Sequence, residues 1–239
     1  MKLYVDAGTT WSKVCEFSNG NSIFADKYRD YLVSSAETRK LYIVPSNLLK
    51  NCDLEFIAAT GHMSKSNLKY ENNYLNEVIA LSKGFLNTVA KNGLVLDLGS
   101  RDVKWVKFQD GKFKDLDWNN ACASATGATV EMLMKFYDVN VDDLVAVDER
   151  YSITCGIFGL EKIMDDVANG EQANIAISKF LHGIAYNAWS FAKKPDELYL
   201  SGGFCDNKCF IDSLSKYVKV NKLGRFILVD GLISEFPCG

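Results

Sequence analysis

Two short stretches of this sequence carry a carboxylate, small turn residues and an amine at the same spacing. Asp6 ends an apolar run, and Lys13 follows it seven residues later. Asp97 and Lys104 repeat this arrangement about 90 residues further along the chain. Glycine and hydroxyl residues fill both turns, so backbone N–H groups could approach an anion closely and an ammonium group could add charge. Each stretch therefore predicts a hairpin that binds phosphate.

The repetition carries more weight than either hairpin alone, because a single polar hairpin more often has only a structural role. Two copies favour a duplicated fold that binds a nucleotide. Mg²⁺ keeps several of its waters and uses few carboxylates, so Asp6 could hold it through water. The expected phosphate contacts in the two turns are Gly8, Thr9, Thr10, Gly99 and Ser100.

A third candidate nucleotide-binding motif, after the two hairpins, is the glycine pair Gly202-Gly203. It follows an apolar run at 197–201 that predicts a strand, and it precedes a pattern that predicts a helix over about 207–218. Glycines at such a junction allow a flat ligand such as adenosine to approach the backbone. Asn207 stands at the start of the expected helix and joins this set.

The pattern of apolar residues predicts an α/β protein. Helical periodicity appears over 76–91, and Asp110-Gly111 is a typical turn of a two-residue hairpin. Further helices are expected near 35–42 and over 124–137, 158–168 and 171–192. The remaining strands are expected at 2–6, 12–17, 22–27, 56–60, 94–97, 103–108, 112–116 and 226–229.

Composition excludes several classes of function. The chain has 239 residues, of which 48% are hydrophobic and 24% charged, as in an ordinary globular protein. A net charge of −3 gives no electrostatic basis for binding nucleic acid or an anionic membrane. No apolar run reaches the roughly 18 residues of a membrane span, and the N-terminus lacks the pattern of a signal peptide. We expect a cytoplasmic protein, in which seven cysteines favour thiol or metal chemistry over disulfides.

The order of these motifs resembles the actin, sugar-kinase and acetate-kinase superfamily. That resemblance implies a duplicated ribonuclease-H-like fold, the actin-like ATPase fold, in which two lobes with mixed five-stranded sheets clamp ATP and Mg²⁺. The lobes would cover residues 1–92 and 93–239. It further implies a phosphate-1 motif at the first hairpin, a phosphate-2 motif at the second, and an adenosine motif at the glycine pair.

A more specific resemblance lies in the segment from Asn119 to Gly127, which reads Asn-Asn-Ala-Cys-Ala-Ser-Ala-Thr-Gly. It is similar to the Asn-Asp-Lys-Cys-Ala-Ala-Gly-Thr-Gly segment of the 2-hydroxyacyl-CoA dehydratase activators, the BadF/BadG/BcrA/BcrD-type ATPases. Residues 59–61, Ala-Thr-Gly, also match that family, and Cys155 falls where it has its second cysteine. The resemblance implies an ATPase that passes electrons to an iron–sulfur dehydratase or a benzoyl-CoA-reductase-like partner. It also implies a [4Fe–4S] cluster shared across a homodimer and held by Cys122 and Cys155.

The same resemblance implies a role for each polar group. Thr9, Thr10 and Lys13 would hold phosphates, and Gly127 would line the nucleotide together with the glycine pair. The positions that would manage Mg²⁺ and the attacking water are Asp6, Asp97 and Asp102. Arg101 stands where the family has a glutamine, and it could either stabilise transition-state charge or hold product ADP and slow turnover.

Departures from the family pattern leave other functions open. Ser100 and Arg101 replace the family's Gly-Gln, and Ala125 replaces a glycine. One alternative is a degenerate, non-enzymatic relative that binds a nucleotide or a cluster. The other is a small-metabolite kinase of the same superfamily, for which the sequence offers no separate acceptor-binding insertion.

Overall fold

The computed structural model describes residues 1–50, 52–70, 73–119, 126–153 and 156–237. Its chain divides into two compact units, Met1–Lys91 with Arg225–Gly239, and Asn92–Gly224. The C-terminal segment from Arg225 therefore belongs to the first unit. The lobes expected from the sequence, 1–92 and 93–239, place this segment in the second.

The first unit is built on a mixed five-stranded sheet of order β3-β4-β2-β1-β6. β1 pairs antiparallel with β2 and parallel with β6, so the first hairpin lies inside the sheet rather than at its edge. The strands are β1 (Lys2–Ala7), β2 (Trp11–Phe17), β3 (Leu32–Ser35), β4 (Arg39–Pro45), β6 (Ala58–Thr60), and the separate pair β5 (Glu55–Phe56) and β7 (Lys69–Tyr70). The helices are α1 (Ile23–Lys27), α2 (Ser46–Leu49), α3 (Ser64–Asn67), α4 (Glu77–Thr88) and α9 (Ile227–Glu235).

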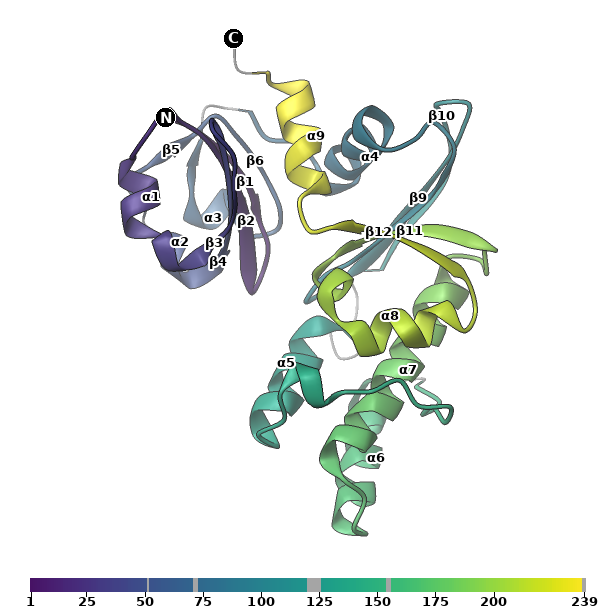
Figure 1. The fold of residues 1–239 in the computed structure, drawn as a ribbon. Coiled ribbons are helices and arrows are strands. Elements are labelled where there is room, and N and C mark those ends of the chain that lie inside the picture. The colour runs from purple at the N-terminus through teal and green to yellow at the C-terminus, as the bar shows by residue number, and fades with distance from the viewer. Residues whose placement is uncertain (51, 71–72, 120–125, 154–155, 238–239) are drawn as a thin grey trace. The chain divides into compact units, whose positions relative to one another are not determined.

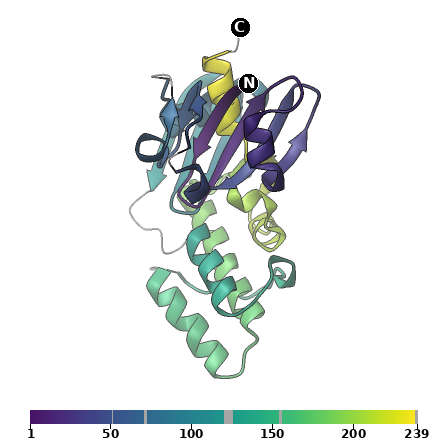
Figure 2. The same cartoon turned by 90° about the vertical axis from the view of Figure 1, so that its left-hand side faces the viewer.

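The two faces of this sheet have different partners. Leu3 and Val5 point into a core with Phe24 of α1 and Leu49 of α2. Tyr4, on the opposite face of β1, packs in a cluster with residues of α9, which lies behind the sheet in Figure 2. Because side chains alternate along a strand, Asp6 shares the face of Tyr4.

The second unit also has a mixed five-stranded sheet, of order β10-β9-β8-β11-β12, in which β9-β8-β11 corresponds to β2-β1-β6. One face of its sheet carries Leu94, Leu96 and Leu98 into a core with α7 and α8, which cover that face in Figure 1. Both units thus have the mixed five-stranded sheets predicted from the sequence. The elements are β8 (Gly93–Leu98), β9 (Val103–Gln109), β10 (Lys112–Asn119), β11 (Glu197–Gly202), β12 (Lys219–Gly224), α5 (Gly127–Phe136), α6 (Gly156–Ala168), α7 (Ala173–Phe191) and α8 (Lys208–Ser215).

Three expected elements have a different structure. The strand expected at 22–27 is instead helix α1 (Ile23–Lys27), because Ser22 caps the helix by accepting a hydrogen bond from Ala25 N. Residues 35–42 contribute to the β3–β4 hairpin rather than to a helix. The apolar run 226–229 begins helix α9, since a short apolar run fits a buried helix as well as a buried strand.

Close packing of α4 and α9 explains why the last segment belongs to the first unit. A Cβ on Gly84 would lie 2.0 Å from Ile227 O, and one on Gly231 would lie 1.9 Å from Ala80 O. The two glycines therefore permit the helix backbones to touch, as Figure 1 shows for the neighbouring α4 and α9. Among the described residues, no helix is long and apolar enough to cross a membrane.

Candidate functional site

The first hairpin brings its carboxylate and its amine into direct contact. Asp6 and Lys13 are cross-strand neighbours in the register of β1 and β2, which follows from their seven-residue spacing around a short turn. Lys13 Nζ lies 2.9 Å from Asp6 Oδ2, and the two side chains are only 14% and 6% exposed. The ammonium group is thus held at the end of the sheet beside the turn.

Contacts from α2 fix the shape of the turn that follows Asp6. Ser46 Oγ donates to Gly8 O at 2.7 Å, and Ser46 N donates to Thr10 O at 2.9 Å. A Cβ on Gly8 would lie 2.6 Å from Trp11 O, so this tight turn requires glycine there. These contacts hold the turn in place, and the Thr9 side chain is exposed.

The second hairpin encloses its lysine between two carboxylates. Lys104 Nζ lies 3.1 Å from Asp97 Oδ2 and 3.1 Å from Asp102 Oδ2. Lys104 is 1% exposed and Asp97 is 5% exposed, so this ion pair is more deeply buried than that of the first hairpin. The geometry gives Lys104 the role of a counter-ion that orients both carboxylates.

Two further side chains hold these carboxylates, and the sequence interpretation did not include them. Ser201 Oγ at the end of β11 donates to Asp97 Oδ1 at 2.8 Å. Trp118 Nε1 at the end of β10 donates to Asp102 Oδ2 at 2.6 Å. Ser201 ends an expected strand, whereas Trp118 lies two residues beyond the strand expected at 112–116, because β10 extends to Asn119. The exposed Arg101 lies in the turn between the two carboxylates.

The turn of the second hairpin is also joined to the start of α5. Thr126 Oγ1 donates to Ser100 O at 2.7 Å, and Gly127 N donates to Gly99 O at 3.2 Å. A Cβ on Gly127 would lie 3.2 Å from both Gly99 O and the Ser100 Cα. The structure thus places Gly127 directly against the second turn.

The glycine pair has two distinct environments. Gly202 has φ +92°, and a Cβ there would lie 2.3 Å from Leu98 O, so the β11 backbone passes directly against β8. A Cβ on Gly203 would meet nothing within 4 Å. Asn207 Oδ1 accepts a hydrogen bond from Phe210 N at 2.9 Å and thereby caps α8.

Comparison of the two units extends their internal repeat to a third strand. Thr60 is the register partner of Asp6 in the parallel pair β1–β6, just as Ser201 is the partner of Asp97 in β8–β11. Each hydroxyl residue is followed by a glycine with nearly the same positive φ, +93° at Gly61 and +92° at Gly202. Each unit therefore holds an aspartate, a lysine and a hydroxyl residue at the same positions of its sheet.

The predicted metal ligands have two different outcomes. Cys122 and Cys155 lie outside the described residues. In the part of the chain that the structure describes, no group of three or more His, Cys, Asp or Glu side chains could hold a metal ion. Mg²⁺ needs only one or two carboxylates beside waters and phosphates, and the hard oxygens of Asp97 and Asp102 with one neighbouring lysine fit such an ion.

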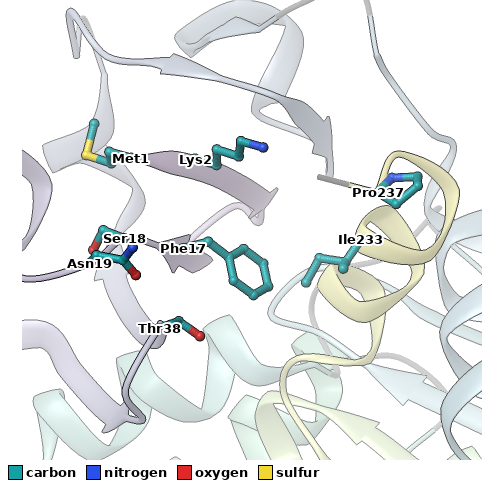
Figure 3. Close-up of a pocket in the computed structure, with 8 residues that line it drawn as sticks. All are labelled: Met1, Lys2, Phe17, Ser18, Asn19, Thr38, Ile233 and Pro237. Atoms are coloured by element: carbon teal, nitrogen blue, oxygen red, sulfur yellow. The ribbon is translucent and has the colours of Figure 1, made fainter. Parts of the chain in front are cut away.

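A hollow and a buried thiol lie away from the turns of the two hairpins. A hollow of about 450 Å³ is lined by Lys2, Phe17 and Ile233, at the opposite end of the β1–β2 hairpin from Asp6 (Figure 3). Cys205 is fully buried, and burial raises the pKa of its thiol to about 12. The structure therefore gives this cysteine a packing role.

No family model matches the chain, but it is similar to curated proteins along most of its length. The chain is 22% identical to the activator of lactoyl-CoA dehydratase from Anaerotignum propionicum, over 92% of this chain and 89% of that protein. It is 23% identical to the (R)-2-hydroxyglutaryl-CoA dehydratase activating ATPase from Acidaminococcus fermentans, over 86% of this chain and 83% of that protein.

Solved structures show the same fold. The activator of the 2-hydroxyisocaproyl-CoA dehydratase from Clostridium difficile, with bound ADPNP, aligns with a TM-score of 0.74 at 15% identity. The alignment covers 98% of this chain and 93% of that protein. The fold is therefore that of the actin-like ATPases, and the resemblance to dehydratase activators predicted from the sequence is confirmed.

Proposed function

We propose that this chain is an ATP-dependent iron–sulfur electron donor that activates a 2-hydroxyacyl-CoA dehydratase or a benzoyl-CoA-reductase-like partner. The observation that carries the proposal is its similarity to named activators of such dehydratases along most of its length. The two Asp–Lys hairpins support the nucleotide part, because they combine tight turns, buried carboxylates and ammonium groups.

The first hairpin would bind phosphate through the backbone of its turn, the hydroxyls of Thr9 and Thr10, and Lys13. The ammonium of Lys13 now pairs with Asp6, so a bound phosphate would compete with that carboxylate for it. Phosphoryl transfer depends mainly on positioning and on charge stabilisation. Loss of the Lys13 charge should therefore lower nucleotide affinity and hydrolysis together.

The second hairpin would hold Mg²⁺ and orient the attacking water. Asp97 and Asp102 carry two negative charges against the single positive charge of Lys104, which leaves the cluster net negative. These two carboxylates would hold a divalent cation with its waters, which would supply positive charge beside the phosphates. Lys104 and Trp118 keep the carboxylates in place, while the exposed Arg101 could stabilise charge on a transferring phosphate.

The iron–sulfur cluster would be held by Cys122 and Cys155 of each of two subunits, because a [4Fe–4S] cluster usually takes four thiolates. When bound, it would supply one-electron chemistry. Support for a homodimer comes from α5 and α6, the helices that follow these cysteines in sequence. Both expose large apolar side chains by more than half: Met132 by 56%, Phe136 by 69%, Phe158 by 61% and Met164 by 51%. Such surfaces are typical of protein–protein contacts.

Anaerobic purification followed by iron and sulfide analysis tests the cluster. We expect about four iron atoms per dimer, lost in Cys122→Ser or Cys155→Ser. The buried Cys52 provides a matched control, and Cys52→Ser should keep the iron. An iron-free protein after anaerobic reconstitution would remove the electron-transfer part of the proposal.

ATP hydrolysis measured on the same preparation tests the nucleotide part. Turnover by the protein alone supports an ATPase. Nucleotide binding without turnover would instead indicate a non-enzymatic relative, and turnover that requires an added small-molecule acceptor would indicate a kinase.

A further inference from the structure

Thr60 carries a buried hydroxyl that the site described so far does not use. The residue is 0% exposed. Within the described part of the chain, its Oγ1 has no hydrogen-bond partner. A buried hydroxyl without a partner destabilises a fold, so its presence requires an explanation.

The position of Thr60 relates this hydroxyl to Asp6. Both residues occupy one register position of the parallel strands β1 and β6, and register partners project from the same face of a sheet. Gly61 has φ +93°, and a Cβ there would lie 2.5 Å from Ala7 O. The end of β6 is thus pressed against β1, which leaves Thr60 beside the carboxylate.

The second unit shows the same arrangement with its hydrogen bond formed. Asp97 is held on both oxygens, with Lys104 near Oδ2 and Ser201 donating to Oδ1 at 2.8 Å. In the first unit Lys13 contacts Asp6 Oδ2 at 2.9 Å, while the equivalent hydroxyl, that of Thr60, is unused. At the register partner of the hairpin aspartate, the units therefore differ in whether the hydroxyl is bonded to the carboxylate.

We propose that Thr60 is a positioning residue for the nucleotide site, and that its hydroxyl donates to Asp6 when the Lys13 ammonium turns to a bound phosphate. This inference rests on the proposed nucleotide-binding function. The buried carboxylate of Asp6 would otherwise lose its partner as the phosphate binds, and uncompensated burial of that charge would weaken binding. The hydroxyl of Thr60 is the neighbouring donor that can replace the ammonium group.

The proposal predicts opposite effects of one substitution on the free and the bound protein. Thr60→Val keeps the shape of the side chain and removes the hydroxyl. Without nucleotide, its melting temperature should equal or exceed that of the wild type, because an unpartnered buried polar group is lost. Its affinity for Mg²⁺ with a non-hydrolysable ATP analogue should fall about tenfold, as expected for a lost hydrogen bond to a charged group.

Two variants act as controls in calorimetric titrations and thermal melts. Thr60→Ser retains the donor and should restore the affinity. Ser201→Ala removes a hydroxyl that is already bonded to Asp97, so its melting temperature without nucleotide should fall. A merely structural role for Thr60 would give Thr60→Val the same behaviour as Ser201→Ala.

Wild-type affinity in Thr60→Val would overturn this inference and leave the proposed function standing. A lower melting temperature of free Thr60→Val would also overturn it. Failure of the wild-type protein to bind the analogue at all would instead refute the nucleotide-binding function and the inference together.

Discussion

Substitution of Lys104 by methionine tests the role of the buried charge cluster. Methionine has a similar length but carries no charge. In the wild type, Lys104 Nζ has carboxylate oxygens of Asp97 and Asp102 at 3.1 Å each, and the side chain is 2% exposed. The change would leave two neighbouring carboxylates, one of them almost fully buried, without their common counter-ion.

The expected cost is about 3–5 kcal/mol, the usual range when one partner of a buried ion pair is removed. For a protein of this size each kcal/mol lowers the melting temperature by about 2–4 °C, so the midpoint should fall by about 6–20 °C. Lys83 provides a control, because its ion pair with Glu235 is 37% exposed on both sides. Lys83→Met should cost about 0–1 kcal/mol, as exposed pairs do.

Urea unfolding followed by tryptophan emission measures this difference. Of the four tryptophans, Trp105, Trp118 and Trp189 lie in the second unit with Lys104, so the signal reports mainly on that unit. Asp97→Asn added to Lys104→Met should recover part of the loss, since it removes one of the uncompensated charges. An equal loss of unfolding free energy in Lys104→Met and Lys83→Met would refute the view that burial makes the charges around Lys104 important for stability.

Three further predictions concern packing, the nucleotide site and pH. Gly84→Ala should destabilise the first unit by about 1–3 kcal/mol in urea unfolding through overpacking, whereas Gly203→Ala, in open space, should cost less. Trp118→Phe should raise the Mg²⁺ concentration needed for nucleotide binding about tenfold by releasing a carboxylate of the second hairpin, and Trp189→Phe should not. Burial, helped by nearby cationic side chains, lowers the pKa of His182 in the folded protein. As the pH falls, this histidine therefore takes up its proton at a higher pH in the unfolded chain than in the folded one. Stability measured by urea unfolding should therefore fall as the pH drops below 6.5, and His182→Gln should reduce that slope.

The sequence by itself determines the two hairpins and their chemistry. A spacing of seven positions around a short turn places Asp6 and Lys13 opposite each other on neighbouring strands, and the same holds for Asp97 and Lys104. Local spacing is enough for this result, because strand pairing within a hairpin follows from its turn. The repeated hairpin also indicated the duplicated fold.

Partners from distant parts of the chain were decided only by the tertiary structure. Thr60 and Ser201 reach the hairpins because strand order and register bring their strands alongside, and no local pattern encodes that order. Trp118 reaches the second hairpin through the neighbouring β9–β10 hairpin, opposite Lys104. The run 226–229 was ambiguous for a related reason, since its helix is stabilised by packing against α4. Spacing in sequence therefore determined which groups form each hairpin, whereas long-range pairing decided how deeply they are buried and which neighbours hold them.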